Sequence, residues 1–224
     1  MTKIIVSYDG TDNDDDALAL ARVLGAAGAS LGLAYVRHVK EQESDREAAA
    51  QSDAQALLRH GAVWLERPEI PQHVIINAST PDGLAELAAI EHADAVVFGS
   101  EYRTAANHVQ PQASALRMLE GGPFAIGIAP AGLRLRDYSV GAIAAINEAG
   151  DTSPVETAEI LAGKLGASIV PRASAGADLL VLGSTPGTSP GRCSISASTA
   201  YVIETSNCAV LVVPRGTVLR FGGQ

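Results

Sequence analysis

Short aliphatic runs alternate with longer segments of helical periodicity from the first strand-like run to Pro130. The runs predict strands at 3–8, 31–39, 73–77, 94–99 and 124–129. The segments between them predict helices at 14–27, 41–60, 79–92 and 114–119, because their apolar residues recur every three or four positions. Regular alternation of strands and helices is typical of a parallel sheet built from right-handed crossovers.

The same alternation starts again after Pro130, at a shorter length. Strands are expected at 139–146, 168–170, 177–184 and 209–213, with helices at 154–165 and 199–205. Residue types that favour helix starts stand before two of the first-half helices. Thr11 is expected to be the N-cap of one helix, and Ser79 is expected to cap another.

Short motifs recur in the two halves at fixed offsets, which indicates an internal duplication. The offset in residue number is 84 between Gly99 and Gly183, whereas it is 138 between Gly28 and Gly166. The difference, 54, is the length of chain that the second half lacks, and in the first half this stretch holds two expected helices and one strand. We expect a full α/β domain at 1–130, a linker at 131–137, a truncated copy at 138–216 and a tail at 217–224.

Charge and composition narrow the class of partners. The chain has 25 acidic and 16 basic residues, for a formal net charge of −9, so it lacks the basic surface of a nucleic-acid binder and has no attraction to an anionic membrane. We expect no secretory signal, because the first residues lead directly into a strand-like run. No apolar run reaches the ~18 residues of a membrane helix. Cys193 and Cys208 are too few for a disulfide scaffold. A cytoplasmic protein with reduced thiols is therefore expected.

Four short motifs carry a family resemblance that spans nearly the whole chain. Asp9 ends the first strand, and each penultimate strand ends in a Gly-Ser pair, at 99–100 and 183–184. A glycine-rich loop follows at 183–192, and the chain closes with the sequence Asn-Cys-Ala-Val-Leu-Val-Val-Pro at 207–214. In this order and spacing the motifs resemble the universal stress protein (UspA-like) family in its tandem form.

The resemblance implies a fold of the adenine nucleotide alpha hydrolase-like type, with a five-stranded Rossmann-like sheet in a full domain. It also implies that the last strands of two domains pair antiparallel across a two-fold or pseudo-two-fold axis. An exposed apolar edge strand is an aggregation hazard. The closing strands at 124–129 and 209–213 are therefore expected to pair within the chain and cover each other.

Family members that bind ATP carry Gly-x2-Gly-x9-Gly-Ser/Thr after the penultimate strand. Glycines let backbone N–H groups approach phosphates, and the last pair stands at a helix N-terminus, which favours anions. The aligned positions are Gly99, Tyr102, Gln112 and Ala113 in the first half, and Gly183, Pro186, Ser196 and Ala197 in the second. Pro186 also removes an N–H donor. Tight binding of ATP or ADP is not expected, and a smaller anion or a neutral ligand is the alternative.

The candidate cofactor-binding residues follow from this alignment. They are Asp9, Gly99, Ser100, Gly183, Ser184, Ser196 and Ser198. Asp9 stands at the carboxyl end of a strand, where open α/β sheets bind ligands, and in the family this aspartate lies beside the adenine and ribose. Alternatively, Asp9 caps the following helix. Asn147 aligns with Asp9 in the second half and carries no charge, while Ser196 and Ser198 offer hydroxyls to an anion.

Other residues with reactive side chains favour structural roles. The acidic run at 12–16 suits a helix start, and a divalent cation is its alternative use. The five histidines are His38, His60, His73, His92 and His108. They show no ligand spacing, and among them His108 lies beside the first degenerate loop. Cys208 is expected to be buried. No nucleophile elbow is present, so neither catalytic nor metal-binding residues are expected.

Three functions stay open at this point. The first is a stress-response protein, without enzymatic activity, whose nucleotide site is degenerate. The second is a regulator that binds ATP, ADP or another anion near Asp9 and Ser184. The third is a weak nucleotide hydrolase, for which the sequence offers no positioned base and no Lys or Arg clamp on a γ-phosphate. The shortened second half leaves one sheet face uncovered, so a homodimer is expected.

Overall fold

The computed structural model describes the chain except for residues 39–43, 148–149, 172–175 and 223–224. The described strands are β1 (Lys3–Ser7), β2 (Ser30–Arg37), β3 (Gln72–Ile76), β4 (Ala95–Phe98), β5 (Ala125–Ile128), β6 (Ala142–Ile146), β7 (Ser168–Ile169), β8 (Leu179–Leu182) and β9 (Ala209–Val212). They form one sheet in the order β3-β2-β1-β4-β5-β9-β8-β6-β7. Neighbouring strands are parallel except β5 and β9. The expected Rossmann-like α/β fold is confirmed.

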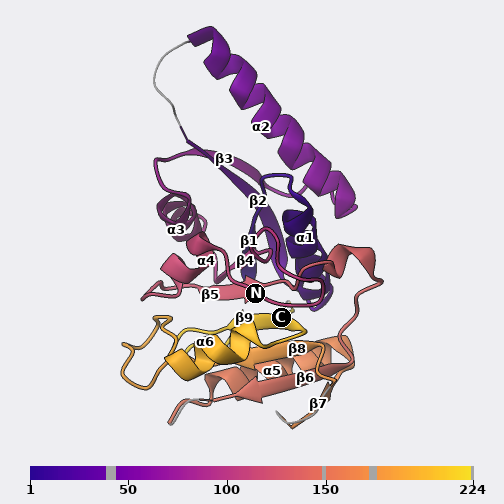
Figure 1. The fold of residues 1–224 in the computed structure, drawn as a ribbon, viewed down its shortest axis with the longest axis vertical. Coiled ribbons are helices and arrows are strands. Elements are labelled where there is room, and N and C mark those ends of the chain that lie inside the picture. The colour runs from indigo at the N-terminus through magenta and orange to yellow at the C-terminus, as the bar shows by residue number, and fades with distance from the viewer. Residues whose placement is uncertain (39–43, 148–149, 172–175, 223–224) are drawn as a thin grey trace.

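Helices cover both faces of this sheet (Figure 1). They are α1 (Asp12–Ala26), α2 (Ser44–Trp64), α3 (Thr80–Ile90), α4 (Ala113–Met118), α5 (Ser153–Leu165) and α6 (Ala197–Glu204). All six were expected from the sequence, whereas the 3₁₀ turn η1 (Leu133–Leu135) in the linker was not. The first turns of α2 extend beyond the edge of the sheet (Figure 1).

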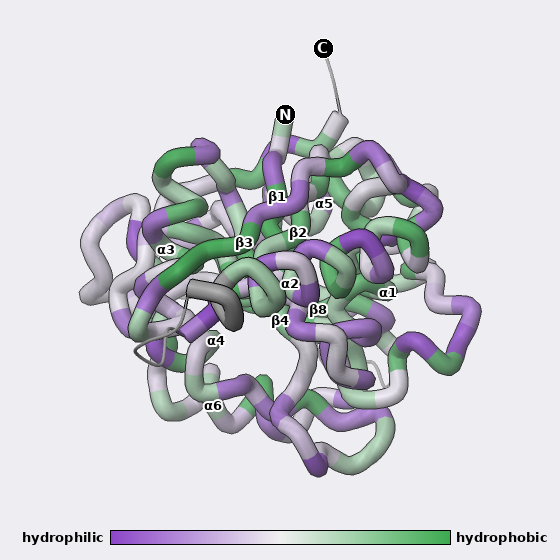
Figure 2. The backbone as a smooth tube through the Cα atoms, turned by 90° about the horizontal axis from the view of Figure 1, so that it is seen from above, coloured by the Kyte–Doolittle hydropathy of each residue, from purple (hydrophilic) through white to green (hydrophobic). Residues whose placement is uncertain are grey.

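Side chains alternate between two hydrophobic clusters, as the two-residue period of a strand requires. Ile4 and Val6 of β1 pack in one cluster with residues of α1, α2 and α5. Ile5 packs in the other cluster with residues of α3, α4 and α6. In the second half, Ile143 and Ala144 of β6 divide between the two clusters in the same way. Figure 2 shows hydrophobic residues gathered in the inner strands β1, β2 and β4.

The two halves of the chain join through one antiparallel pair of strands at the centre of the sheet. Gly127 of β5 lies opposite Leu211 of β9, and the pairing extends one residue to each side. Residues 125–128 and 209–212 are fully buried. The expected pairing of the two closing strands within the chain is confirmed.

The C-terminal segment after residue 216 packs into the core between the two halves. Leu219 and Phe221 are buried in the cluster that contains α1 and α5. Thr2 donates from both its backbone nitrogen (2.9 Å) and its hydroxyl (2.7 Å) to the Arg220 carbonyl. Figure 1 accordingly shows the N- and C-terminal ends close together. The segment that the sequence marked as a tail therefore has a structural role.

Both expected N-cap positions are confirmed, but only Ser79 makes a capping hydrogen bond with its side chain. The Ser79 hydroxyl accepts from the Asp82 N–H at the start of α3. Thr11 stands at the N-cap position of α1, but its side chain makes no capping hydrogen bond. Instead the Thr11 N–H donates to the Asp9 carboxylate (3.2 Å), which closes a local turn.

The strand register also corrects the sequence alignment of the two halves by one position. Ile4 of β1 lies opposite Ala95 of β4, and Ile143 of β6 lies opposite Leu179 of β8. Because Ala95 and Leu179 are equivalent at the offset of 84, Ile4 and Ile143 are equivalent as well. The offset between β1 and β6 is therefore 139, not 138, and Asn147 corresponds to Tyr8. The counterpart of Asp9 is residue 148, which lies outside the described residues.

Candidate functional site

The two Gly-Ser pairs at the ends of β4 and β8 make the same hydrogen bonds. The Ser100 hydroxyl donates to the Ala129 carbonyl (2.7 Å) and accepts from the Gln110 N–H (3.3 Å). The Ser184 hydroxyl donates to the Val213 carbonyl (2.8 Å) and accepts from the Ser194 N–H (3.3 Å). Both serines are fully buried. Each hydroxyl ties the end of one strand to the end of the closing strand and to the loop between them.

The two glycines of these pairs have different structural roles: Gly99 lies in close contact with another backbone segment, and the N–H of Gly183 makes a backbone hydrogen bond. A Cβ atom on Gly99 would lie 1.8 Å from the Asn13 carbonyl oxygen at the start of α1. The Asn13 amide nitrogen donates to the Ser100 carbonyl (2.7 Å), so α1 is fixed against the end of β4. The Gly183 N–H donates to the Ile146 carbonyl at the end of β6 (3.0 Å). Close packing therefore accounts for Gly99 without a ligand.

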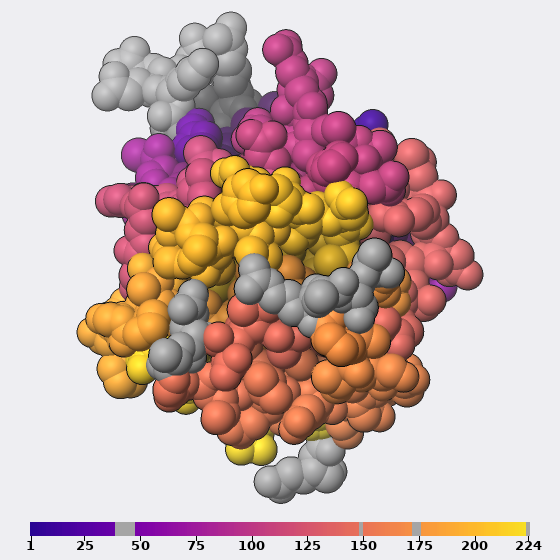
Figure 3. All heavy atoms as spheres, turned by 60° about the horizontal axis from the view of Figure 1, so that its bottom comes forward, coloured from indigo at the N-terminus to yellow at the C-terminus, as the bar shows by residue number. Residues whose placement is uncertain are grey.

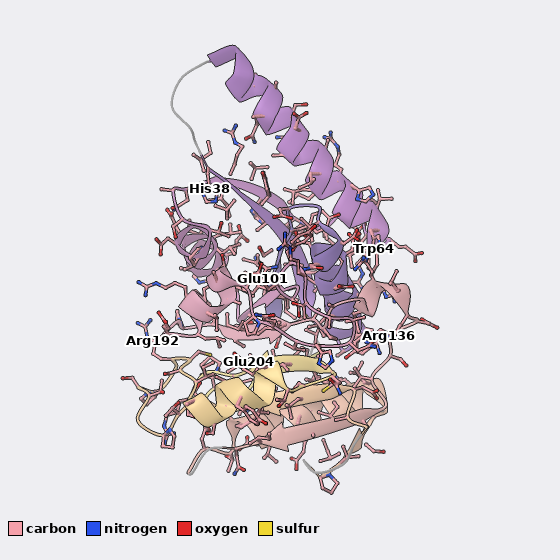
Figure 4. All side chains as sticks on the ribbon, in the orientation of Figure 1. His38, Trp64, Glu101, Arg136, Arg192 and Glu204 are labelled. Atoms are coloured by element: carbon pink, nitrogen blue, oxygen red, sulfur yellow. The ribbon has the colours of Figure 1, made fainter. Side chains whose placement is uncertain are left out.

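The loops that follow the Gly-Ser pairs are held against the opposite half of the molecule. The Val109 N–H donates to the Ser206 carbonyl (3.2 Å), and the Cys193 N–H donates to the Gly122 carbonyl (2.7 Å). These two bonds are equivalent, because Cys193 is the counterpart of Val109 and Ser206 is the counterpart of Gly122 at the offset of 84. The Arg192 guanidinium, labelled in Figure 4, also reaches the Gly121 carbonyl (3.2 Å).

The residues that replace the motif glycines take other roles. Tyr102 is exposed, and the Arg103 guanidinium lies 5.8 Å from the centre of its ring. The Gln112 side-chain amide donates to the Ser100 carbonyl (3.4 Å). Ser196 caps α6 by accepting from the Thr199 N–H, and its hydroxyl lies 2.7 Å from that of the exposed Ser198. Among the candidate serines, Ser196 and Ser198 are the pair that a solvent-borne anion can reach.

Asp9 is exposed at the carboxyl edge of the sheet, next to a buried carboxyl group. Its N–H donates to the Asp14 carboxyl group (2.7 Å) on the first turn of α1. Asp14 is 4 % exposed, and burial together with the neighbouring Asp9 carboxylate raises the pKa of Asp14 to about 8. The alternative role expected for Asp9, a cap of the following helix, is wrong, because its carboxylate accepts from the Thr11 N–H before the helix begins, whereas contact of Asp9 with a ligand stays a prediction.

Close to Asp9 in the sequence, Tyr8 takes part in a cluster of hydrogen bonds that connects α1 to α2. The Tyr8 hydroxyl lies 3.2 Å from the Asp15 carboxylate and 3.1 Å from the His60 Nδ1 atom. Burial raises the pKa of Tyr8, and the nearby Asp15 charge raises it further. Burial also raises the pKa of Asp15, against the lowering effect of the Tyr8 hydrogen bond. His60 therefore has a structural partner at this edge.

The sequence did not predict the most buried carboxylate of the acidic run. Asp16 is fully buried and accepts from the N–H groups of Gly132 and Arg134, both at 2.8 Å. The Arg134 guanidinium lies 3.2 Å from the same carboxylate and also binds Asp12 (2.7 Å). The acidic run therefore anchors the linker that joins the two halves. Only the long separation of these residues in sequence hid this contact.

Asp151 takes the corresponding place in the second half. Its carboxylate accepts from the Gly216 N–H (3.2 Å) and from the Ser153 N–H (3.0 Å) at the start of α5. Burial acts to raise the pKa of Asp151, but hydrogen bonds from Ser153 and Gly216 prevail and lower it. Gly132 and Gly216 are counterparts at the offset of 84, and both have positive φ angles.

The cysteines are not placed for reactivity. Burial raises the pKa of Cys193 to about 12, and its sulfur donates to the Phe124 carbonyl (3.1 Å). Burial, followed by the Asp178 charge, raises the pKa of the half-buried Cys208 to about 11. Within the described ranges, no three His, Cys, Asp or Glu side chains are grouped to hold a metal ion. No described helix is long and apolar enough to cross a membrane.

Comparison with solved structures identifies the fold. A universal stress protein from Archaeoglobus fulgidus DSM 4304 matches with a TM-score of 0.71 and 14 % identity, covering 96 % of this chain and 98 % of that one. A putative universal stress protein from Pseudomonas aeruginosa UCBPP-PA14 matches with a TM-score of 0.63 and 15 % identity, covering 96 % and 94 %. No family model and no curated protein sequence matches. The chain has the universal stress protein fold, and the resemblance seen in its motifs is confirmed at that level.

Proposed function

We propose that the protein is a cytoplasmic stress-response protein of the universal stress type, which acts by regulation and without an enzymatic step. The whole-chain likeness of fold supports this assignment. The two halves are proposed to be a full and a truncated copy of one ancestral domain. The hydrogen bonds of Ser100 and Ser184, repeated at the offset of 84, support the duplication.

We propose further that neither half binds ATP tightly. The observation that carries this is the use of both Gly-Ser hydroxyls within the fold, with both following loops held against the other half. Each half also lacks the second glycine, the third glycine and the terminal hydroxyl of the phosphate motif. A charge-assisted hydrogen bond contributes about 1.5–3 kcal/mol, so loss of two such bonds in one site weakens binding roughly a hundredfold or more. The half-buried Ser196 and the exposed Ser198 leave room for a smaller anion at the start of α6.

Isothermal titration with ATP and Mg²⁺ at physiological salt tests this proposal. We expect no dissociation constant tighter than about 100 μM. A constant in the low micromolar range would contradict the proposal and favour the second function, a nucleotide-binding regulator. The variants Asp9→Ala and Ser198→Ala would then show which half holds the ligand, because each removes an exposed side chain from one half only.

Two further measurements separate the remaining functions. A nucleotide-binding regulator is expected to copurify with an adenine compound, which absorbs near 260 nm and which mass spectrometry identifies. A weak hydrolase is expected to turn over ATP above the rate of a heat-killed control. The regulator is the stronger alternative, because Asp9 offers a carboxylate at the ligand edge of the sheet. We also propose that the protein works as a homodimer, through the surface argued below.

A further inference from the structure

The second half has a groove where the first half has helix α3. In the first half, Leu84 and Leu87 of α3 are buried in the cluster that contains Ile5 and Val96 of the sheet. In the second half, no described residue takes the place of α3. A groove of about 360 Å³ lies there instead, with sheet residues such as Leu180 on its floor and α6 along its wall.

The described lining of this groove carries no charged side chain. It consists of Ala144, Ile146, Gly176, Ala177, Leu180, Tyr201, Val202, Thr205, Ser206, Asn207 and Cys208. Charged residues make up 18 % of the chain, and the formal net charge is −9. A neutral surface on an acidic protein allows two identical chains to meet there with little charge repulsion. Depletion of charge and enrichment of tyrosine are features of protein interface cores.

The outer face of α6 differs from that of its counterpart α4 at the position beside the groove. Arg117 of α4 is exposed and pairs with Glu120 at 2.9 Å. Its counterpart at the offset of 84 is Tyr201, which is 68 % exposed on α6 at the rim of the groove. Figure 3 looks onto this end of the molecule, where α6 is yellow and the neighbouring strands are orange. A solvated ion pair in one half is thus matched by an exposed aromatic ring in the other.

We propose that this groove binds a second copy of the chain about a two-fold axis, with Tyr201 of each protomer in the groove of the other. An isologous interface needs a surface that is complementary to itself, and a projecting ring beside an open groove has that property. A large aromatic side chain enclosed in a well-packed pocket is also the usual energetic centre of an interface.

Hydroxyl groups in the groove suit the phenol of a partner tyrosine. Thr205 donates its hydroxyl proton to the Tyr201 carbonyl (2.7 Å), and Ser206 donates its own to the Val202 carbonyl (2.6 Å). Their oxygen atoms remain acceptors, and a phenol is a donor. Tyrosine combines the apolar body and the polar tip that such a surface favours.

This proposal rests on the homodimer of the proposed function. Sedimentation velocity from 1 to 100 μM tests it in the absence of nucleotide, so its failure is distinguishable from failure of the proposal on ATP binding. We expect the wild-type protein to reach twice the 23.0 kDa mass of one chain. Tyr201→Arg restores the first-half residue type and should raise the dimer dissociation constant at least tenfold. Tyr102→Arg is the matched control, because this comparably exposed tyrosine does not line the groove and its replacement should leave the constant unchanged.

Two outcomes overturn the proposal: a wild-type protein that stays monomeric at 100 μM, or a dimer that persists unchanged in Tyr201→Arg. Far-UV circular dichroism checks that the variant folds, and Tyr201→Ser replaces it if the arginine variant does not. Hydrogen exchange gives a second readout. Backbone amides at 176–182 and 201–208 should become more protected at high concentration, whereas protection confined to other segments would also contradict the proposal.

Discussion

The two halves of the molecule share a hydrogen-bonded framework but differ in what covers it and what anchors it. Ser100 and Ser184 bind the closing strands identically, and the loops that follow cross to the opposite half through equivalent bonds. The first half adds α2, β3 and α3, whereas the second proceeds from β7 to β8 without any described element between them. The framework therefore does not depend on the covering helices.

The comparison of the two halves also indicates that the shared hydrogen bonds serve the fold rather than the binding of a ligand. In both halves the buried serine is present while the remaining motif positions hold residues other than glycine, such as Tyr102 and Pro186. If these hydroxyls were available to a ligand, they would be exposed at the carboxyl edge of the sheet, yet both serines are fully buried. They face the closing strand instead. A Gly-Ser pair after a buried strand thus indicates that the serine binds the end of the neighbouring closing strand, whether or not the protein binds a nucleotide.

The largest expected effect concerns the linker anchor of the first half. Asp16→Ala removes the buried partner of the Arg134 guanidinium, which is 19 % exposed and keeps only the exposed Asp12 as a described carboxylate partner. It also leaves two backbone N–H groups without their acceptor. Removal of one member of a buried ion pair typically destabilises a protein by about 3–5 kcal/mol. We expect a loss in that range in the free energy of unfolding, measured with urea.

Two comparisons sharpen this result. Asp12→Ala removes an 81 % exposed partner of the same arginine and should cost less than about 1 kcal/mol. Asp151→Ala removes the second-half anchor, whose hydrogen bonds among the described residues come from N–H and hydroxyl groups, so its effect should be smaller than that of Asp16→Ala. Equal losses in the free energy of unfolding for Asp16→Ala and Asp151→Ala would show that the Arg134 guanidinium contributes nothing to stability through Asp16.

The next effect concerns crowding at the end of β4. Gly99→Ala places a Cβ atom against the backbone oxygen of Asn13, so α1 must move. Overpacking of this kind costs about 1–3 kcal/mol, and a backbone neighbour puts the expected loss near the upper end of that range. Gly187→Ala, in the second-half loop with open space around the new methyl group, is the control and should change stability by less than about 1 kcal/mol. A Gly99→Ala protein as stable as wild type would contradict the close packing of α1.

The strands and helices could be predicted from sequence because each has a local signal. Periodicity of two or of three to four residues placed every described element of both halves except η1. The pairing of β5 with β9 also followed, because two exposed apolar closing strands need cover. The one-position error in aligning the halves arose from a glycine pair, Gly28 and Gly166, that lies beyond the strands it was used to align.

The roles of site residues could be predicted only in part, because they depend on contacts distant in sequence. Asp16 meets the linker 116 and 118 residues later, and no local pattern marks that pairing. Ser100 and Ser184 were identified as candidates from their motif, but the direction of a hydroxyl is set by the fold. The repeated spacing of 29 residues to Ala129 and to Val213 was a usable signal for their true partners.

Opposite responses to pH are expected from one carboxyl group in each half. The pKa of Asp14 is raised to about 8 in the folded state, above its ordinary 3.8, so Asp14 stabilises the fold most at low pH, and this contribution is lost as the pH rises toward 8. The pKa of Asp151 is lowered, so its contribution is present at neutral pH and is lost as the pH falls below the ordinary range of aspartate.

Urea unfolding of two asparagine variants between pH 3 and pH 8 checks these signs. Relative to wild type, Asp14→Asn should gain about 4 kcal/mol in the free energy of unfolding from pH 5 to pH 8, because it removes a carboxyl group that ionises in the folded state only at a cost. Asp151→Asn should lose stability at pH 7 and approach wild type in acid. Asp53→Asn on the exposed face of α2 is the control and should show no trend. A rising wild-type advantage over Asp14→Asn with pH would contradict the assignment.

The smallest expected effect tests the likeness of the two halves most directly. Ser100→Ala and Ser184→Ala each remove a buried hydroxyl that donates to a closing-strand carbonyl and accepts from a loop N–H. A typical intramolecular hydrogen bond contributes about 1 kcal/mol net, so we expect each variant to lose about that amount in urea unfolding. Because the two donor–acceptor distances to the closing strands are nearly the same, 2.7 Å and 2.8 Å, the two losses should be equal within error.

Ser198→Ala provides the baseline for this pair. Its hydroxyl is exposed and, among the described residues, bonds to the neighbouring Ser196, so the loss of stability should be near zero. Two unequal losses would mean that one serine has a further role. A larger effect at Ser100 would point to the Asn13 and Gln112 amides that converge on its carbonyl, since no such amide contacts are recorded for Ser184 among the described residues. The double variant Ser100→Ala/Ser184→Ala should show additive losses if each serine secures only its own half, and a greater loss if the two closing strands depend on each other through the β5–β9 pairing.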